Sequence, residues 1–153
     1  MAGERLNQRS VPLWLLAAAV AVILIRIAVP EPVITTLVTW VPLERAAAAA
    51  SQQGKPILYD FTADWCVPCR NLDRDGWANE DVALIVNREF VPVRVDASAR
   101  EEDLDPAVAA LMKRYRVDSF PTLVVTDAEG NELRKESGFG GRALLTRFLQ
   151  SRQ

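Results

Sequence analysis

The distribution of apolar residues divides the chain into two parts. Residues 11–29 are almost continuously apolar, whereas from residue 51 onward short apolar runs alternate with polar segments. A helix of about 19 residues spans roughly 28 Å, close to the thickness of the hydrocarbon core of a bilayer. The pattern therefore predicts a transmembrane anchor at 11–29, between a polar N-terminal segment at 1–10 and a connector at 30–50.

Two other interpretations of residues 11–29 remain. A cleaved signal peptide would normally have a shorter apolar region with a small-residue cleavage site directly after it, and the alanines at 46–50 lie too far along the chain. A helix that is apolar on all sides could instead be buried inside a globular domain, which a domain of this size rarely accommodates. Arg26 lies about one turn from the end of the segment, where its side chain can extend to the lipid headgroups.

After the connector, the pattern predicts alternating strands and helices. Runs rich in β-branched and aromatic residues mark strands, and apolar residues at helical spacing mark the helices. The predicted strands are 57–62, 91–95, 122–126 and 132–137. The order strand–helix–helix–strand–helix–strand–strand–helix predicts an α/β domain over 51–153, with a four-stranded sheet and helices on both faces.

Local signals place several helix ends. Asn79 and Asp105 are typical N-cap residues, and Pro106 suits the first position of a helix. Gly54 is expected to end a short alanine-rich helix at 44–53, because glycine readily adopts the left-handed conformation that closes helices.

Two further residues predict how the elements fit together. Gly76 is expected to break the helix that begins at Cys66 and runs to about Asp75. Pro92 has no N–H to donate to a neighbouring strand, which indicates that the strand at 91–95 lies at an edge of the sheet.

Composition and charge exclude some classes of function. The net charge is −2 and no basic run stands out, so no nucleic-acid partner is expected. The chain has no histidine and only two cysteines, whereas a zinc site usually needs four ligands from cysteine, histidine or carboxylate side chains.

The two cysteines, Cys66 and Cys69, directly follow a predicted strand and begin a predicted helix. The free N–H groups and the dipole of a helix N-terminus favour an anion, which raises the thiolate fraction of Cys66. Cys69 lies one turn further on and can close a disulfide. A structural disulfide this short would constrain the unfolded chain little. The spacing therefore favours a redox site, with Cys66 as the exposed nucleophile and Cys69 as the resolving thiol.

The sequence Asp-Trp-Cys-Val-Pro-Cys at 64–69 resembles the active-site signature of the thioredoxin superfamily. The preceding strand, 55–61, and the segment 115–123 resemble the superfamily's flanking strand and its cis-proline segment. The motif Ala-Asp-Trp-Cys-Val at 63–67 is most similar to the C-terminal domains of the DsbD family of transmembrane thiol:disulfide interchange proteins. The resemblance covers about 51–153 and implies a thioredoxin-like fold with a central mixed four-stranded sheet.

The resemblance also implies roles for two carboxylates. Asp60 lies among apolar neighbours in a predicted strand, so burial should raise its pKa, and the family implies that it exchanges a proton with Cys69. Asp73 resembles a second carboxylate that tunes the cysteines of DsbD-like domains, although those domains usually carry glutamate there. A position on the solvated surface is the alternative for both residues.

Four residues are expected to bind substrate. Trp65 is expected to cover the disulfide as an apolar lid, unless it belongs to the core. Phe120, Pro121 and Thr122 resemble the loop that faces the active site, with a cis bond before Pro121. The backbone beside Pro121 would then be free to pair with an extended substrate peptide.

These observations predict a membrane-anchored thiol:disulfide oxidoreductase that reduces protein disulfides, with the redox-active Cys66–Cys69 disulfide and no other cofactor. The positive charges on the two sides of 11–29 nearly balance. The location therefore follows from the resemblance: a single-pass protein of the bacterial inner membrane, with its C-terminal domain in the periplasm. A cytoplasmic domain is the alternative orientation.

The expected partners are protein disulfide substrates, the lipid bilayer and a separate membrane electron donor. DsbD-like domains receive electrons from a multi-helix transmembrane partner domain, and this sequence shows one short apolar segment, which cannot move electrons across a bilayer.

Two other functions fit the same residues. The fold could act as a thiol oxidase or isomerase, because the direction depends on the relative stability of dithiol and disulfide, which Val67 and Pro68 do not settle. The cysteines could alternatively carry a soft metal such as Cu(I), or hold a partner protein, without catalysis.

Overall fold

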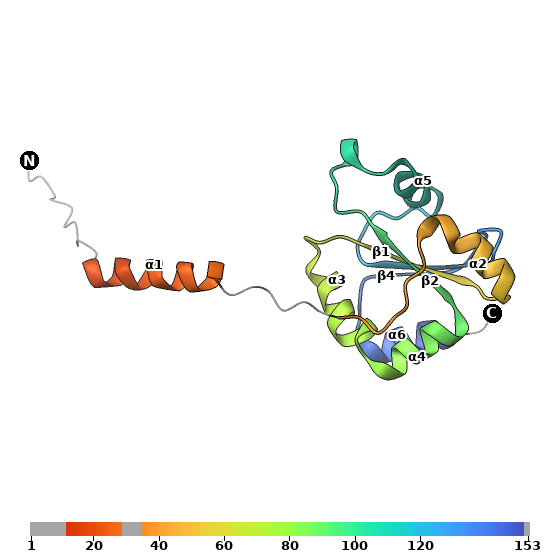
Figure 1. Ribbon diagram of the computed structural model, residues 1–153, viewed down its shortest axis with the longest axis horizontal. Helices are drawn as coiled ribbons and strands as arrows, with labels where there is room; N and C mark the ends of the chain where they lie inside the picture. Colours follow the sequence, from red (N-terminus) through yellow and green to blue (C-terminus); the bar gives the residue numbers. More distant parts are fainter. Residues whose placement is uncertain (1–11, 29–34, 152–153) are drawn as a thin grey trace, which may run out of the picture. The chain divides into compact units, whose positions relative to one another are not determined.

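The computed structural model describes residues 12–28 and 35–151. The chain separates into two compact units, residues 1–33 and residues 34–153 (Figure 1).

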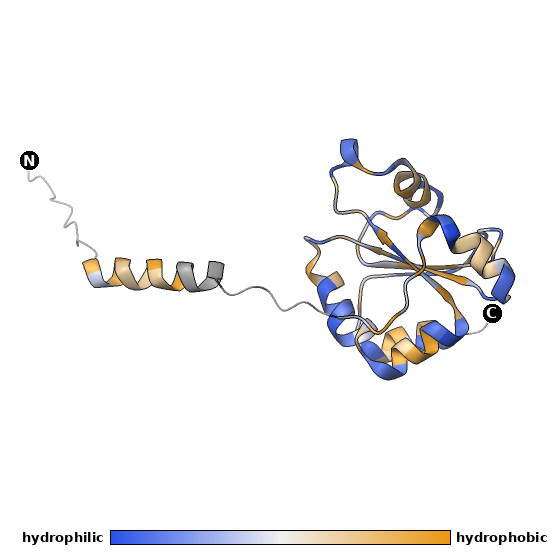
Figure 2. Cartoon of the chain, in the orientation of Figure 1, coloured by the Kyte–Doolittle hydropathy of each residue, from blue (hydrophilic) through white to orange (hydrophobic). Residues whose placement is uncertain are grey.

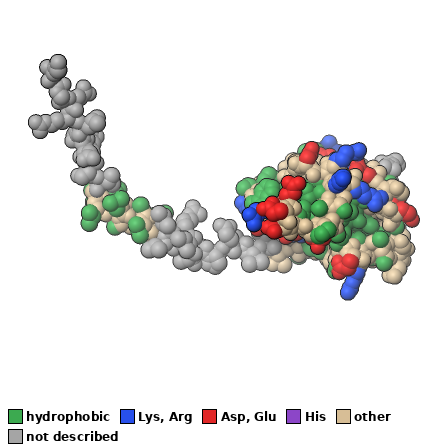
Figure 3. Space-filling model, turned by 90° about the horizontal axis from the view of Figure 1, so that it is seen from above, with side chains coloured by type: hydrophobic (Ala, Val, Ile, Leu, Met, Phe, Trp, Pro, Cys, Tyr) green, Lys and Arg blue, Asp and Glu red, His purple; other side chains and the backbone are tan. Residues whose placement is uncertain are grey.

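The first unit contains helix α1, Leu13–Ala28, which is 16 residues long. The described part of this helix carries mostly apolar side chains, and its large ones are exposed (Figures 2 and 3). Within the described residues, no helix combines the length and the apolar character needed to cross a bilayer. A transmembrane role for 11–29 stays a prediction, and the predicted polar segment at 1–10 lies outside the described residues.

The second unit contains the remaining helices and strands. It begins with the 3-10 turn η1 (Leu43–Arg45), helix α2 (Ala46–Gln53) and strand β1 (Ile57–Thr62). Helix α3 (Val67–Leu72), the π-helical segment η2 (Asp73–Trp77) and helix α4 (Glu80–Glu89) follow. Next come strand β2 (Val91–Asp96), the 3-10 turn η3 (Glu101–Asp103) and helix α5 (Pro106–Arg114). Strands β3 (Thr122–Thr126) and β4 (Glu132–Ser137) and helix α6 (Arg142–Gln150) complete it, so the predicted order from β1 onward is confirmed.

The four strands form one mixed sheet in the order β2-β1-β3-β4. β1 pairs with β2 in parallel and with β3 in an antiparallel arrangement, and β3 pairs antiparallel with β4. β1 is therefore central, and β2 is an edge strand, as Pro92 indicated.

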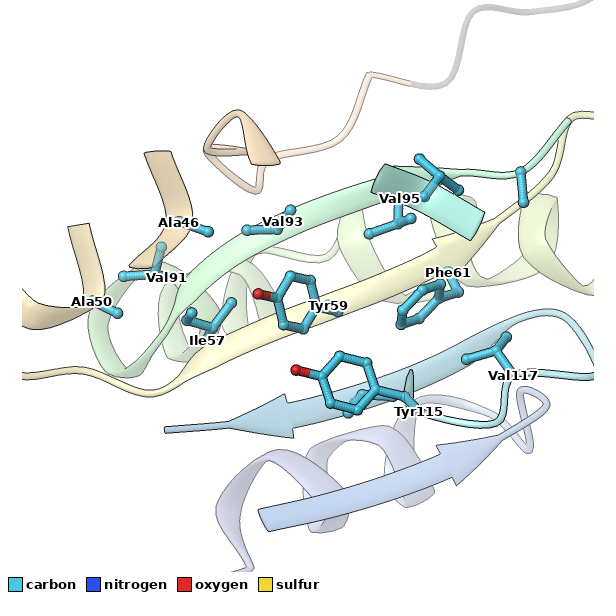
Figure 4. Close-up of a cluster of buried hydrophobic side chains, with 13 residues drawn as sticks. Ala46, Ala50, Ile57, Tyr59, Phe61, Val91, Val93, Val95, Tyr115 and Val117 are labelled. Atoms are coloured by element: carbon cyan, nitrogen blue, oxygen red, sulfur yellow. The ribbon is translucent and has the colours of Figure 1, made fainter. Parts of the chain in front are cut away.

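Alternate residues of β1 face two different cores. Tyr59 and Phe61 lie on the face covered by α2 and α5, where they pack with Tyr115 and with valines of β2 (Figure 4). Leu58 lies on the other face, among residues of α3, η2, α4 and α6 such as Trp77. Asp60 shares the parity of Leu58 and so belongs to this second face.

The predicted caps are confirmed. The Asn79 carboxamide oxygen accepts a hydrogen bond of 3.2 Å from the Val82 N–H. The Asp105 carboxylate accepts one of 2.7 Å from the Ala107 N–H. Gly54 ends α2 with a φ of 63°, the left-handed conformation that glycine adopts without steric cost.

The prediction that Gly76 breaks its helix is wrong. The chain remains helical after Leu72, because the π-helical η2 includes Gly76 and ends only at Trp77. A Cβ atom at Gly76 would lie 2.8 Å from Leu145 Cδ2 and 2.9 Å from Leu72 Cδ1. The glycine thus serves the close approach of α6 to η2.

Residues 35–42 lie along the second unit and are called the strap below. Four hydrogen bonds attach the strap to the fold. The Leu37 N–H donates to the Trp77 carbonyl (2.9 Å), and the Val41 N–H donates to the Pro92 carbonyl (2.8 Å). The Asn87 carboxamide accepts from the Thr39 N–H (2.9 Å) and donates to the Leu37 carbonyl (3.1 Å). Val38 is buried in the core that contains Trp77. The compact unit therefore begins before residue 51, and much of the predicted connector is part of it.

Candidate active site

Cys66 and Cys69 form a disulfide at the N-terminus of α3, with Cα atoms 5.3 Å apart. Cys66 is the N-cap residue and has an extended backbone, and its Sγ accepts a hydrogen bond of 3.2 Å from the Cys69 N–H. The end of β1 and the start of α3 therefore place the pair where the sequence predicted it.

Two contacts hold the loop between β1 and α3. The Asp64 N–H donates to the Ser98 hydroxyl over 2.8 Å, which ties the loop to the segment after β2. The Arg70 guanidinium reaches back from α3 and donates to the Asp64 carbonyl over 2.8 Å. The disulfide is thus presented by a loop that is fixed from both sides.

Neither cysteine is exposed in the disulfide form. Cys66 is 4% exposed and Cys69 is 2% exposed. Ala63 and Phe120 pack against the pair. The prediction that Cys66 presents the exposed sulfur is therefore wrong for this form, because Phe120 from the distant cis-proline loop contributes to its cover.

Trp65 lies outside this cover. Its side chain is 62% exposed, and its ring makes an edge-to-face contact with Phe120, with centroids 5.7 Å apart. Trp65 is therefore not a core aromatic. In this form Phe120 packs against the disulfide, and Trp65 packs against Phe120, so the role of Trp65 as a lid stays a prediction.

The peptide bond between Phe120 and Pro121 is cis, as the resemblance implied. The Pro121 carbonyl accepts a hydrogen bond of 2.7 Å from the Gly138 N–H. The buried Thr122 hydroxyl donates to the Ser119 carbonyl over 2.8 Å, so this side chain supports the loop from within. In the part of the chain that the structure describes, the backbone N–H and C=O of Phe120 have no hydrogen-bond partner.

Asp60 is buried in the centre of β1, with 1% of its surface exposed. Burial, with a smaller contribution from the nearby Asp73 carboxylate, raises the pKa of this carboxyl group to about 6, although the Arg94 cation and a hydrogen bond from Trp77 oppose the rise. The predicted burial and its effect on the pKa are confirmed, and the surface alternative for Asp60 is wrong.

The two oxygens of Asp60 have different surroundings. Trp77 Nε1 donates to Oδ2 over 2.9 Å, and Arg94 Nη2 donates to the same oxygen over 3.3 Å. Oδ1 is buried and has no hydrogen-bond partner among the described residues. A buried oxygen without a donor disfavours the charged form of the carboxyl group, which agrees with the raised pKa.

Arg94 links Asp60 to Asp73. It lies opposite Asp60 in the parallel pair of β1 and β2, and its Nη2 also contacts Oδ1 of Asp73. The side chains of Asp73 and Arg94 are 21% and 29% exposed, so the bridge runs from the buried carboxyl group toward the surface. Asp73 belongs to this charged network and does not lie on a fully solvated face of its helix.

Trp40, from the strap, covers the outer side of this network. Its ring centroid lies 4.7 Å from the Arg94 Cζ, and its ring packs edge-to-face on Trp77 at 5.7 Å. Its Nε1 donates to the Thr36 hydroxyl over 3.1 Å, within the strap.

Sequence reasoning missed three of these residues: Arg94, Trp77 and Trp40. One signal was available for Arg94, the one charged residue inside the run Val-Pro-Val-Arg-Val. Its partner could not be identified, because the register of a parallel pair depends on the whole crossover between its strands.

Within the described residues, no group of three or more histidine, cysteine, aspartate or glutamate side chains is arranged to hold a metal ion. The soft ligands at the site are the two cysteines, which become available to a metal only when the disulfide is reduced.

The place of this disulfide in the fold defines a class of proteins. A cysteine pair that begins the helix after the central strand, beside a cis-proline loop, is the arrangement of the thioredoxin-like thiol:disulfide oxidoreductases. A family model described as a thioredoxin-like domain matches residues 43–152. The chain belongs to this family.

The relatives of the chain sharpen this assignment. The thiol:disulfide interchange protein DsbD of Yersinia pestis is 31% identical over 108 residues, which cover 69% of this chain and 17% of DsbD. The chain thus spans about a sixth of the length of such relatives.

Two solved structures agree with this relationship. One, described as DsbH oxidoreductase, superposes with a TM-score of 0.64 at 25% identity, covering 77% of this chain and 85% of that one. The oxidised C-terminal domain of Neisseria meningitidis DsbD superposes with a TM-score of 0.57 at 25% identity, covering 69% and 89%. The resemblance to DsbD C-terminal domains is confirmed.

Proposed function

We propose that this protein is a membrane-anchored oxidoreductase that reduces protein disulfides in the periplasm. The observation that carries the proposal is the Cys66–Cys69 disulfide at the start of α3, on a sheet whose central strand buries the carboxyl group of Asp60. A dithiol on a fold that also buries a group titrating near neutral pH suits repeated thiol–disulfide exchange.

The reaction begins from the reduced pair. The Cys66 thiolate attacks one sulfur of a substrate disulfide, which breaks the substrate S–S bond, forms a mixed disulfide and releases the other sulfur as a thiolate. Cys69 then loses its proton and attacks the Cys66 sulfur, which frees the second substrate thiolate and re-forms the Cys66–Cys69 disulfide. Two electrons pass from the dithiol to the substrate. The Cys69 N–H, which bonds the Cys66 sulfur in the disulfide, also favours the attacking thiolate.

Asp60 is the proposed acceptor of the Cys69 proton. With a pKa raised to about 6 by burial, its carboxyl group is mostly ionised at pH 7, yet it is a stronger base than an exposed aspartate. Its Oδ1 has a free lone pair, since no donor of the described residues occupies it.

The loop around Pro121 is the proposed binding site for the substrate chain. The free N–H and C=O of Phe120 suit pairing with an extended peptide, as in strand addition. Trp65 and Val67 are 62% and 56% exposed and border the disulfide, which provides an apolar surface for the residues around the substrate cysteine.

The proposed anchor is the apolar segment at 11–29, and the large apolar side chains exposed on α1 support it. Each turnover leaves the Cys66–Cys69 pair oxidised, so the protein needs a dithiol donor that returns two electrons. We propose a separate membrane protein for this role, by analogy with DsbD, which is a thiol:disulfide interchange protein.

The test is the redox state of the two cysteines inside cells. Intact cells are quenched with acid, and free thiols are alkylated with a mass tag, with Cys66→Ser and Cys69→Ser variants to assign the bands. We expect a mostly reduced pair in a domain that added protease can reach from the periplasmic side. A mostly oxidised pair would overturn the reductase direction and indicate an oxidase.

The donor is tested by trapping. A Cys69→Ala variant cannot resolve its mixed disulfides, so we expect it to accumulate a disulfide-linked complex with a membrane protein, which a Cys66→Ala/Cys69→Ala control lacks. A Cys69→Ala variant linked to no membrane protein would argue against a separate donor.

A further inference from the structure

The strap brings a side chain to the redox site that the proposed reaction does not use. Trp40 contacts both groups that donate to Asp60, with Arg94 over its ring face and Trp77 in an edge-to-face contact. The strap is tied to the fold on both sides of Trp40, by the backbone bonds of Leu37 and Val41. Trp40 is therefore held in place beside the charged network.

We propose that Trp40 is a positioning residue that holds the Arg94 guanidinium against Asp60, so that the strap sets how strongly Asp60 binds its proton. The proposal goes beyond the redox function, although its value for catalysis rests on the proposed role of Asp60.

The geometry explains why Arg94 needs such a residue. Its Nη2 is shared between Asp60, at 3.3 Å, and the more exposed Asp73. Its Nε is buried and has no hydrogen-bond partner among the described residues. The guanidinium is thus held by two carboxylates that pull it in different directions and by the face of Trp40. An aromatic face attracts a cation, and the attraction grows when water is excluded.

Without the Trp40 face, Arg94 would follow Asp73 toward water. The charged groups acting on Asp60 are Arg94 from β2 and Asp73 from η2, and Trp77 adds a neutral hydrogen bond. The disulfide of α3 is uncharged, the opposite residue of β3 is Leu123, and the strap contains no ionisable side chain. Loss of the Arg94 cation from Asp60 would therefore raise the pKa of that carboxyl group.

Two substitutions of Trp40 distinguish the attraction of its aromatic face for Arg94 from the exclusion of water by its bulk. Trp40→Leu keeps apolar bulk over the network but removes the aromatic face. Trp40→Phe keeps an aromatic face and loses only the indole N–H, whose partner Thr36 lies within the strap. A role limited to excluding water predicts the same result for both variants, whereas the proposed role predicts a difference.

The experiment follows the carboxyl carbon of Asp60 by NMR between about pH 4 and pH 9, in the oxidised full chain labelled with ¹³C-aspartate. Relative to the unsubstituted chain, we expect the titration midpoint to rise by about half to one pH unit in Trp40→Leu and to change little in Trp40→Phe. An unchanged or lowered midpoint in Trp40→Leu, or equal shifts in both variants, would overturn the proposal.

A double substitution tests whether the effect passes through Arg94. Arg94→Met should raise the midpoint by itself, and adding Trp40→Leu should then produce no further rise. A second shift of similar size in the Arg94→Met background would contradict the proposal. Amide spectra of each variant confirm that the fold is kept.

The same variants distinguish the two proposals. The NMR midpoint reports the position of Arg94 whether or not the protein reduces disulfides. If Trp40→Leu moves the midpoint but leaves the pH profile of disulfide reduction unchanged, then the positioning role stands and the proton transfer by Asp60 fails. If the NMR midpoint and the pH profile of disulfide reduction shift together, then the positioning role of Trp40 and the proton transfer by Asp60 both stand.

Discussion

The two faces of strand β1 differ in what they bury. Tyr59 and Phe61 lie on a face that buries apolar and aromatic side chains, with the Tyr59 and Tyr115 ring centroids 5.8 Å apart (Figure 4). The buried polar side chains on this face, Thr122 and Thr126, are uncharged. The opposite face contains Asp60, with a charged bridge to Arg94 and Asp73. The side chains that β1 places on one face therefore stabilise the fold, and Asp60 on the other face supports the proposed chemistry. Burying an ionisable group costs stability that an apolar residue would not cost, so we expect the second face to be the less stabilising of the two.

The apolar face should be the more sensitive to loss of volume. Phe61→Ala removes a completely buried ring, and we expect the free energy of unfolding to fall by about 3–5 kcal/mol. Urea denaturation of the oxidised chain measures it. A loss below about 1 kcal/mol would remove the distinction between the faces.

On the charged face, we expect a substitution to raise the stability of the fold at high pH and not to lower it. The folded protein raises the pKa of Asp60 from 3.8 to about 6, so between these values it binds more protons than the unfolded chain. The contribution of Asp60 to stability is therefore most favourable below about pH 4 and is lost as pH rises through about 6. Asp60→Asn removes this loss, so we expect it to raise the free energy of unfolding at pH 8 by about 3 kcal/mol, while slowing disulfide reduction at least about tenfold.

Urea denaturation at pH 5 and pH 8 checks the stability of Asp60→Asn, and single-turnover reduction of a disulfide substrate checks its rate. The matched control is Asp118→Asn, an exposed aspartate outside the network, for which we expect neither change. A less stable Asp60→Asn protein at pH 8 would show that the charged form is not the costly one.

A smaller effect is expected at Asp73. Its negative charge raises the pKa of Asp60, and it shares the Arg94 guanidinium. Asp73→Asn removes the repulsion and leaves Arg94 to Asp60 alone, so both changes lower the pKa of Asp60, by about half a unit. NMR titration of the Asp60 carboxyl group gives the value, and a rise in the midpoint would mean that Asp73 mainly holds Arg94 in place.

The smallest effect is expected at Tyr59. Burial, with a contribution from Tyr115, raises the pKa of Tyr59 to about 12, and its hydroxyl has no hydrogen-bond partner among the described residues. Tyr59→Phe keeps the ring packing, so we expect the free energy of unfolding to change by less than about 0.5 kcal/mol. A large loss in thermal or urea unfolding would reveal a polar contribution on the apolar face.

Local patterns predicted most of the fold. The strand at 57–62, the caps at Asn79 and Asp105, and the burial of Asp60 could be predicted because each depends on near neighbours in the sequence. The cysteine pair was equally clear, because its spacing and its place after a strand carry the chemistry.

The remaining parts of the site depend on contacts between distant segments. Arg94 meets Asp60 through the register of β1 and β2, and Trp40 reaches Arg94 through the path of the strap, which no local pattern encodes. Cys66 was expected to be exposed, but Phe120 packs over the pair from a loop more than 50 residues later. Gly76 was interpreted as a helix breaker because a close approach by Leu145 cannot be read from one helix.

The strap has a further consequence for self-association. β2 is an edge strand, and an open edge is a template on which a second chain can add a strand. Pro92 offers no N–H there, and its carbonyl is already bonded to the Val41 N–H of the strap. The start of the edge strand is thus closed by the chain itself, so a shortened chain that begins at residue 43 would uncover it and should aggregate more readily.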